Sequence, residues 1–158
     1  AKAGFTLVEL VLTLLLVGIL AAIGASRFFG TQTYDERGFA GKAVSALRYA
    51  QKSAMAGRCE IRVNLDAAAD SYALTFTGNG AGNGTPGSCP ASGTPVPRPG
   101  GGNYSETAAS GVDVQGGVTL HYSSSGAATI TGGSSTVPIG TFQLNIEPQS
   151  GLAYVQGF

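Results

Sequence analysis

Charged side chains are scarce in this chain, and neither sign is in excess. Only 11% of the 158 residues are charged, and the formal net charge is zero. Nucleic-acid binding needs several basic contacts to phosphates, and Arg98 is the only Lys or Arg that follows Arg62. The composition therefore disfavours nucleic acid as a partner. The polar surface must come mostly from Ser, Thr, Asn, Gln and Gly.

Residues that carry catalysis or bind metals are also few. His121 is the only histidine, and its alternating surroundings, Val118–Tyr122, predict a strand in which a structural role is far more common than a catalytic one. Two cysteines and one histidine do not make a convincing zinc site, and the acids are too scattered for a calcium loop. The glycines of 78–87 lack the Lys-Ser/Thr ending of a phosphate loop. We expect no enzyme activity, no catalytic residue, no metal site and no cofactor.

What the chain does have is a long apolar run at its start, with one acid inside it. From Phe5 to Ser26 the only charged residue is Glu9, and Lys2 and Arg27 flank the run. About 20 apolar residues in a helix span roughly 30 Å, the thickness of the hydrocarbon core of a bilayer. The run predicts a membrane-spanning helix. A carboxylate inside such a helix is unfavourable, so Glu9 is predicted to be functional.

The helical pattern continues beyond this run. Apolar residues at steps of three and four predict one face of an amphipathic helix: Phe39, Ala43, Ala46, Leu47, Ala50 and Ala54. The opposite, polar face would carry Lys42, Ser45, Arg48, Gln51 and Lys52. We predict one long helix from Thr6 to Ala56, bent or loosened around 30–38 and with Gly57 as its C-cap. Its second half would pack on a sheet through Phe39, Leu47 and the alanines.

From Cys59 the period of the pattern changes to two. Cys59–Leu65 and Tyr72–Phe76 alternate apolar with polar residues, and 66–70 would be the turn of an antiparallel hairpin. Further short strands are predicted at Val112–Val114, Val118–Tyr122, Ala127–Thr131, Thr141–Ile146 and Leu152–Val155. The Gly-rich segment 78–102 is predicted to be a long loop, either displayed at the surface or a flexible filler. The expected fold class is α+β, with a long N-terminal helix packed on a mainly antiparallel sheet.

The two cysteines, Cys59 and Cys89, lie in the part of the chain expected to be exported. Two thiols in an oxidising compartment usually pair. A disulfide between them would close a loop of about 30 residues and stabilise the fold by roughly 3 to 4 kcal/mol. The alternative is two unpaired thiols.

The opening string Gly4-Phe5-Thr6-Leu7-Val8-Glu9-Leu10, followed by an apolar helix, resembles the prepilin signature of type IV pilins and type II secretion pseudopilins. The resemblance implies cleavage by prepilin peptidase between Gly4 and Phe5, and N-methylation of the new amine of Phe5. It also implies that the Glu9 carboxylate pairs with the Phe5 amine of a neighbouring subunit. Leaving one buried charge unpaired would cost several kcal/mol, so this pairing would fix the register between subunits.

The same resemblance implies an organisation for the whole chain. Residues 1–4 would end the leader, 5–29 would form the transmembrane and assembly helix, and 30–58 the amphipathic half. Residues 59–158 would form a β-rich globular domain with the loop 78–102. The implied partners are other pilin or pseudopilin subunits, prepilin peptidase and the inner-membrane assembly platform. The implied localisation is the bacterial inner membrane, single-pass with a periplasmic domain, followed by a pilus or pseudopilus filament.

Later residues are similar to a narrower group. The helix Phe39–Gly57, followed at once by a strand, is similar to the FimT and H-type minor pseudopilins. The segments 27–29 and 34–39 are similar to minor pilins of mannose-sensitive haemagglutinin type systems. Many family members have proline where this chain has Ser26, so a straighter helix is predicted here. The expected function is a minor pilin or pseudopilin that joins or primes a filament.

Several alternatives stay open. The chain could be a major pilin of the same apparatus, or a membrane-anchored periplasmic protein that does not polymerise. A secretory signal peptide with a cleavage site at 22–24 is a further reading, against which Glu9 argues. A DNA-binding minor pilin is disfavoured because Leu152–Phe158 contains no charge. The sequence does not distinguish a pilus from a secretion pseudopilus.

Overall fold

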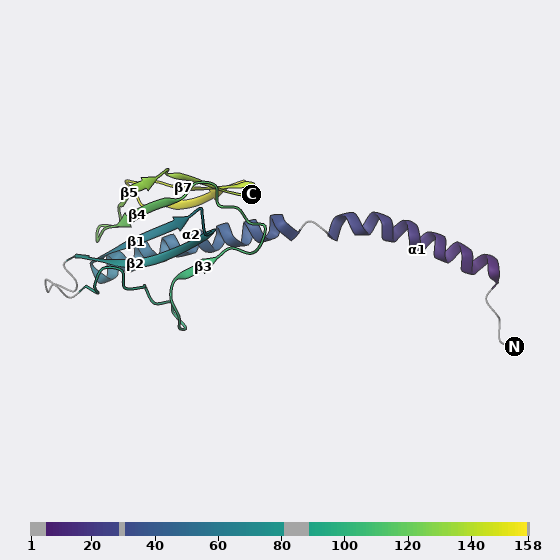
Figure 1. Cartoon of the computed structure of the whole chain (residues 1–158), viewed down its shortest axis with the longest axis horizontal. Helices are drawn as coiled ribbons and strands as arrows, with labels where there is room; N and C mark the ends of the chain where they lie inside the picture. The colour runs from purple at the N-terminus through teal and green to yellow at the C-terminus, as the bar shows by residue number, and fades with distance from the viewer. Residues whose placement is uncertain (1–5, 29–30, 81–88, 158) are drawn as a thin grey trace. The chain divides into compact units, whose positions relative to one another are not determined.

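A computed structural model of the whole chain describes residues 6–28, 31–80 and 89–157 (Figure 1). The helices are α1 (Leu7–Phe28) and α2 (Thr31–Gly57). The strands are β1 (Cys59–Asp66), β2 (Ser71–Gly80), β3 (Ser105–Thr107), β4 (Val118–Tyr122), β5 (Ala128–Gly133), β6 (Thr136–Ile139), β7 (Phe142–Ile146) and β8 (Ala153–Gln156). The chain divides into two compact units, Ala1–Thr31 (the N-terminal unit) and Gln32–Phe158 (the C-terminal unit). The predicted α+β class is confirmed, with a helix packed on antiparallel sheets.

The predicted membrane span is wrong. In the described part of the chain, no helix combines the length and the apolar character that crossing a bilayer requires. The prediction of a single-pass inner-membrane protein is corrected accordingly.

In α2, the predicted apolar face is the buried face. Phe39 and Leu47 are buried, and so are the alanines at 40, 43, 46, 50 and 54. These small side chains let the helix backbone approach the sheets closely, and Phe39 contacts the ring of Tyr72 from β2. The helix is regular through Gly38, where loosening was predicted, whereas 29 and 30 lie outside the described residues. α2 ends at Gly57, and the next residue, Arg58, has the left-handed φ of 54°.

The larger sheet has the strand order β3-β2-β1-β4-β5, and every neighbouring pair is antiparallel. Along β1, buried residues alternate with half-buried ones, so Ile61, Val63 and Leu65 face the core while Arg62 and Asn64 lie on the opposite face. The predicted hairpin is therefore confirmed. Its second strand extends beyond the predicted end, to Gly80.

The smaller sheet has the order β6-β7-β8, also antiparallel. Its buried side chains, including Val137, Leu144 and Ala153, join those of α2 and the larger sheet in one core. Figure 1 shows the strands of both sheets gathered around α2. Every residue of this core lies between Phe39 and Ala153, so the C-terminal unit contains a hydrophobic core of its own.

Two strands were not predicted. β3 consists of Ser-Glu-Thr and lacks the apolar alternation of a buried strand, because it pairs only with β2 at the edge of the larger sheet. β6 contains Pro138, which edge strands tolerate because the missing N–H is not needed there. The predicted strand Val112–Val114 is reduced to a single bridge between Val114 and Ile139.

Candidate functional site

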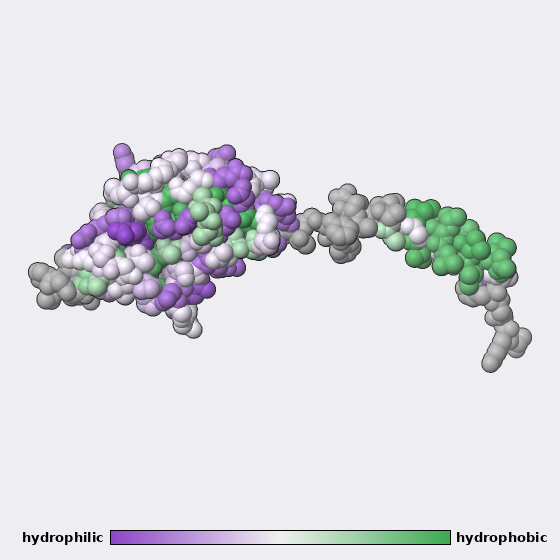
Figure 2. All heavy atoms as spheres, in the orientation of Figure 1, coloured by the Kyte–Doolittle hydropathy of each residue, from purple (hydrophilic) through white to green (hydrophobic). Residues whose placement is uncertain are grey.

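The N-terminal unit exposes apolar side chains on every side of α1. Leu7 is 80% exposed and Val8 is 74% exposed. The other large apolar residues from Leu10 to Leu20 are between 51% and 69% exposed, and they occupy consecutive positions that point in all directions around a helix. In the view of Figure 2, the part of α1 that is coloured shows a hydrophobic surface. A helix that is apolar all round needs an apolar partner to cover it.

The start of α1 has a local explanation for Glu9. Thr6 precedes the helix, and its Oγ1 accepts a hydrogen bond from the backbone N–H of Glu9 at 3.3 Å. Thr and Glu at this spacing form the sequence pattern of a capping box, and an acid in the first turn is further favoured by the helix dipole. Glu9 therefore contributes to helix initiation in addition to any role in assembly. The Thr-x-x-Glu pattern carried this signal, and sequence reasoning overlooked it.

The predicted processing site, Gly4 and Phe5, lies outside the described residues. The amine that would be methylated on Phe5 and would pair with Glu9 lies there too. Glu9 itself is exposed. Cleavage, methylation and the charge pair stay predictions.

Glu36 is a buried acid that sequence reasoning missed. It is 5% exposed, and its Oε2 accepts hydrogen bonds from the backbone N–H and from Oγ1 of Thr141, each at 3.1 Å. The neighbouring Gly140 has a φ of 56°, and a side chain there would collide with the Glu36 carboxylate. This contact joins the beginning of α2 to the turn between β6 and β7. Glu36 gave no signal because it sits in a polar stretch, far in sequence from its partner.

Arg48 and Gln51 were predicted on the solvent face of α2, and both instead donate to backbone oxygens of the β domain. Arg48 donates from Nε and Nη2 to the backbone oxygen of Ala153, at 3.3 and 3.2 Å. Gln51 Nε2 donates to the backbone oxygens of Ser150 and Gly126, at 2.7 and 2.8 Å. These polar side chains fix β8, the turn between β7 and β8 and the turn between β4 and β5 to the helix beside the apolar core.

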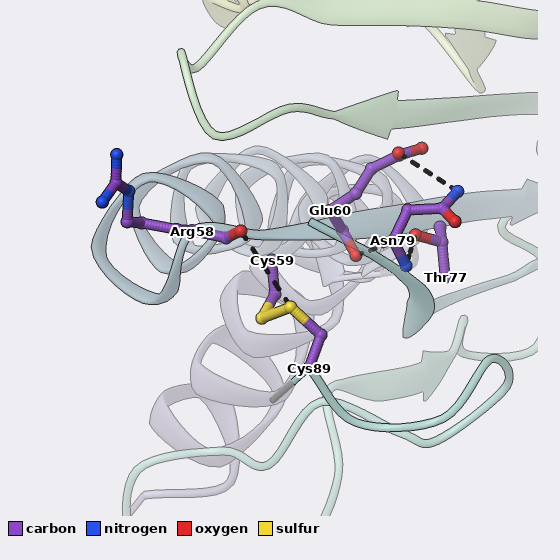
Figure 3. Close-up of a disulfide and its surroundings, with 6 residues drawn as sticks. All are labelled: Arg58, Cys59, Glu60, Thr77, Asn79 and Cys89. Atoms are coloured by element: carbon purple, nitrogen blue, oxygen red, sulfur yellow. Dashed lines mark hydrogen bonds between the residues drawn. A yellow bond between two sulfur atoms is a disulfide. The ribbon is translucent and has the colours of Figure 1, made fainter. Parts of the chain in front are cut away.

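The disulfide between Cys59 and Cys89 is present, as predicted (Figure 3). Cys59 is the first residue of β1, so the bond holds residue 89 at the junction of α2 and β1. On the adjacent part of the hairpin, Thr77 Oγ1 donates to the backbone oxygen of Glu60 at 3.3 Å, and Asn79 Nδ2 donates to Glu60 Oε2 at 3.4 Å. These side-chain hydrogen bonds hold the C-terminal end of β2 against the start of β1, next to the disulfide.

His121 lies on the face of the larger sheet opposite the core. Its Nε2 accepts a hydrogen bond from Arg62 Nε at 3.2 Å, and its Nδ1 lies 2.7 Å from Glu60 Oε1. Because Nε2 is the acceptor, Nδ1 carries the proton and donates to the carboxylate. Both ring nitrogens are therefore engaged by neighbouring strand side chains, an arrangement that suits a cross-strand structural contact.

The chain matches no family model, and no significantly similar curated protein or solved structure was found. The structure establishes an α+β fold with a helix on antiparallel sheets. This arrangement is loosely compatible with a pilin. The narrower resemblance to pilins rests on the residues of the opening motif.

Proposed function

We propose that this chain is a noncatalytic structural subunit, a minor type IV pilin or type II secretion pseudopilin, that joins or primes a filament. The observation that carries the proposal is the exposure of α1. Its apolar residues from Leu7 to Leu20 are all more than half exposed. Such a surface is unfavourable in water at roughly 25 cal/mol per Å², so the helix gains free energy when other helices cover it.

The distribution of these side chains favours several neighbours over one. A helix that binds a single partner has one apolar stripe, whereas α1 is apolar around its whole circumference. Enclosure by the corresponding helices of neighbouring subunits satisfies every face at once. The polar, separately folded C-terminal unit would then remain outside the helical core of the filament.

Glu9 is the charged residue within the apolar stretch of α1 that precedes Arg27, and it gives the filament its proposed register. Enclosure in a bundle would strip water from its carboxylate, and the free energy is recovered only if a cation lies close to it. In this proposal the cation is the amine of Phe5 in a neighbouring subunit, released by cleavage after Gly4. Correct stacking would pair the two charges, and incorrect stacking would leave both unpaired.

The test must separate the charge of Glu9 from its part in the capping box. Glu9→Gln removes the charge but keeps a residue type that serves at this position of a capping box, and Thr6→Val removes the capping hydroxyl but keeps the charge. Both variants and the parent chain would be expressed in a bacterium that carries prepilin peptidase and the assembly machinery of either a type IV pilus or a type II secretion pseudopilus. The fraction of each chain in sheared filaments is measured by immunoblot, and the N-terminus of the processed protein by mass spectrometry.

We expect an N-terminus at methylated Phe5 in all three proteins. Incorporation of Glu9→Gln should fall at least about tenfold, since one unpaired buried charge costs several kcal/mol, whereas Thr6→Val should incorporate within about twofold of the parent. Equal incorporation of Glu9→Gln and the parent would refute the charge pair. A processed protein that begins elsewhere, or that never enters filaments, would refute the pilin assignment itself.

A further inference from the structure

His121 is the centre of a small polar cluster on the face of the larger sheet opposite the core. Arg62 of β1 lies directly opposite it in the register of β1 and β4, and Glu60 lies two residues earlier on β1. Arg62 Nε donates to His121 Nε2 at 3.2 Å, and His121 Nδ1 lies 2.7 Å from Glu60 Oε1. One imidazole therefore contacts a cation through one nitrogen and an anion through the other.

The neighbouring strands add only uncharged groups to this cluster among the described residues. On β5, Thr129 lies opposite His121 in the register. On β2, Asn79 Nδ2 donates to Glu60 Oε2 at 3.4 Å. The side chains of His121 and Glu60 are 20% and 25% exposed, so protons of the solvent reach them. The charge state of the imidazole is therefore opposed by Arg62 and supported by Glu60.

The contact between Arg62 and His121 requires a neutral imidazole. A guanidinium is always protonated and only donates, so Nε2 must offer it a lone pair. When the ring takes up a second proton, that lone pair is occupied, and two N–H donors then face each other. Both groups also carry a positive charge, so the contact becomes repulsive. Imidazole is the side chain whose charge ordinarily changes between about pH 5 and pH 8.

The contact with Glu60 responds to the same proton in the opposite way. Nδ1 of His121 carries a proton in both forms of the ring, and its hydrogen bond to the carboxylate gains strength when the ring becomes cationic. Figure 3 shows Asn79 and Thr77 beside Glu60, where Thr77 Oγ1 donates to its backbone oxygen at 3.3 Å. Glu60 is thus held by β2, and a protonated ring keeps this anion.

Arg62 has room to move when its contact with the imidazole breaks. A hollow of about 590 Å³ lies on this face of the sheet. It is lined by Arg62, His121, Asn64, Ala73, Thr75, Thr119 and Thr131. These described lining residues include no carboxylate, so the hollow offers a released guanidinium water and neutral polar groups. Movement of Arg62 therefore displaces no part of the sheet.

We propose that His121 is a pH-operated switch for the position of Arg62. A neutral ring ties the guanidinium of Arg62 to β4. A protonated ring stays with Glu60 and releases the guanidinium into the hollow, so this face changes from a cluster without net charge to one with an excess positive charge. The cluster lies within the C-terminal unit and does not depend on assembly through α1.

The test is NMR of the full, ¹⁵N-labelled chain in nonionic detergent, titrated from about pH 8 to pH 5. His121 is the only histidine, so the imidazole signals need no further assignment. The Arg62 Nε–H signal is identified by its absence in Arg62→Lys. At high pH we expect a protonated Nδ1 and an unprotonated Nε2. As the ring takes up its second proton, the Arg62 signal should shift with the same midpoint, and its ¹H–¹⁵N NOE should fall to that of a mobile side chain.

Two variants and one internal control separate the switch from a general effect of pH. His121→Gln keeps an acceptor opposite Arg62 but takes up no proton, so the Arg62 signal should not change with pH. Glu60→Gln removes the anion that holds the protonated ring, so release of Arg62 should need a pH lower by about half a unit or more. The Nε–H signal of Arg98 should stay constant, because the pKa of its partner Glu106 is lowered and that carboxylate stays ionised in this range.

Several results would overturn the proposal. An Arg62 signal that does not follow protonation of the ring would show that the two groups are not coupled. An Arg62 signal that titrates equally in His121→Gln would assign its pH dependence to another group. A ring that stays neutral down to about pH 5, or that carries its single proton on Nε2, would exclude the switch. Thermal unfolding verifies that each variant is folded, and none of these outcomes bears on Glu9 or on the assembly proposal for α1.

Discussion

α1 and α2 are neighbouring helices in one chain, yet their apolar residues have opposite surroundings. In α2 the apolar face is covered by the two sheets, and Leu47 is completely buried. In α1 the corresponding type of side chain, such as Leu15, is 58% exposed. The apolar residues of α2 account for folding of the C-terminal unit. Those of α1 are exposed, and the proposed assembly of subunits would cover them.

The comparison is tested most strongly by the same substitution in both helices. Leu47→Ala should lower the free energy of unfolding of the C-terminal unit by about 3 to 5 kcal/mol, because it removes a fully buried side chain and leaves a cavity. Leu15→Ala should change it by less than about 0.5 kcal/mol, as expected for an exposed position. Urea unfolding of the full chain in detergent, followed by tyrosine fluorescence, measures both. A large decrease in the free energy of unfolding in Leu15→Ala would mean that α1 contributes to the fold of the C-terminal unit. The apolar residues of the two helices would then not differ in role.

The disulfide offers a second, slightly smaller effect that is confined to one region. Replacing both Cys59 and Cys89 by serine should lower the free energy of unfolding of the C-terminal unit by about 3 kcal/mol, since the unfolded chain regains the freedom of a loop of about 30 residues. The helical content of α1 should not change, because neither residue lies in the N-terminal unit. Urea unfolding of the full chain measures the stability of the C-terminal unit. Circular dichroism of the full chain and of residues 1–31 measures the helical content. Unchanged stability of the double variant would show that the link adds nothing to this unit.

Lowering the pH should reduce the free energy of unfolding of the C-terminal unit through Glu106 but not through α1. This effect should be smaller than those of Leu47→Ala and of disulfide removal. Lys42 Nζ of α2 donates a hydrogen bond to Glu106 Oε1 of β3, and this bond lowers the pKa of Glu106 from its ordinary value of 4.5. The carboxylate therefore stabilises the C-terminal unit above about pH 4.5. The contribution disappears as the pH falls through the lowered pKa. Lys42 is 59% exposed, so screening by water limits the effect to less than about 1 kcal/mol.

This prediction is measured as the slope of unfolding free energy against pH between about pH 5 and pH 3. Glu106→Gln should have a shallower slope than the parent chain. Glu9→Gln, which alters an exposed acid of α1, should have the parent's slope. A slope that is unchanged in Glu106→Gln would place the acid sensitivity in other carboxylates.

The sequence was sufficient for the elements whose burial on one face imposes a regular local pattern. The spacing of Phe39 to Ala54 predicted the buried face of α2, and alternation predicted β1 and β4, because burial on one face imposes a period along the chain. The disulfide followed from cysteine count and expected compartment. Local patterns failed where the decisive contact joined distant residues. Glu36 and Thr141 are 105 positions apart, and nothing near Glu36 marks it as buried.

The same limitation applies to the edges of the sheets and to the contacts between α2 and the chain that leads into β3. β3 has one sheet neighbour and little apolar content, so no period marked it. Arg98, Tyr104 and Glu106 lie in or just after the segment predicted as a loop, and their meeting with Lys42 depends on how that segment folds back onto α2.

The hydrogen bonds of Arg48 and Gln51 end on backbone oxygens of residues 126, 150 and 153. A backbone oxygen is present whatever side chain a position carries. Outward-facing side chains near these residues can therefore change without loss of these bonds, provided that the path of the backbone is kept. Selection can thus change the outward surface of these turns while their attachment to α2 stays the same.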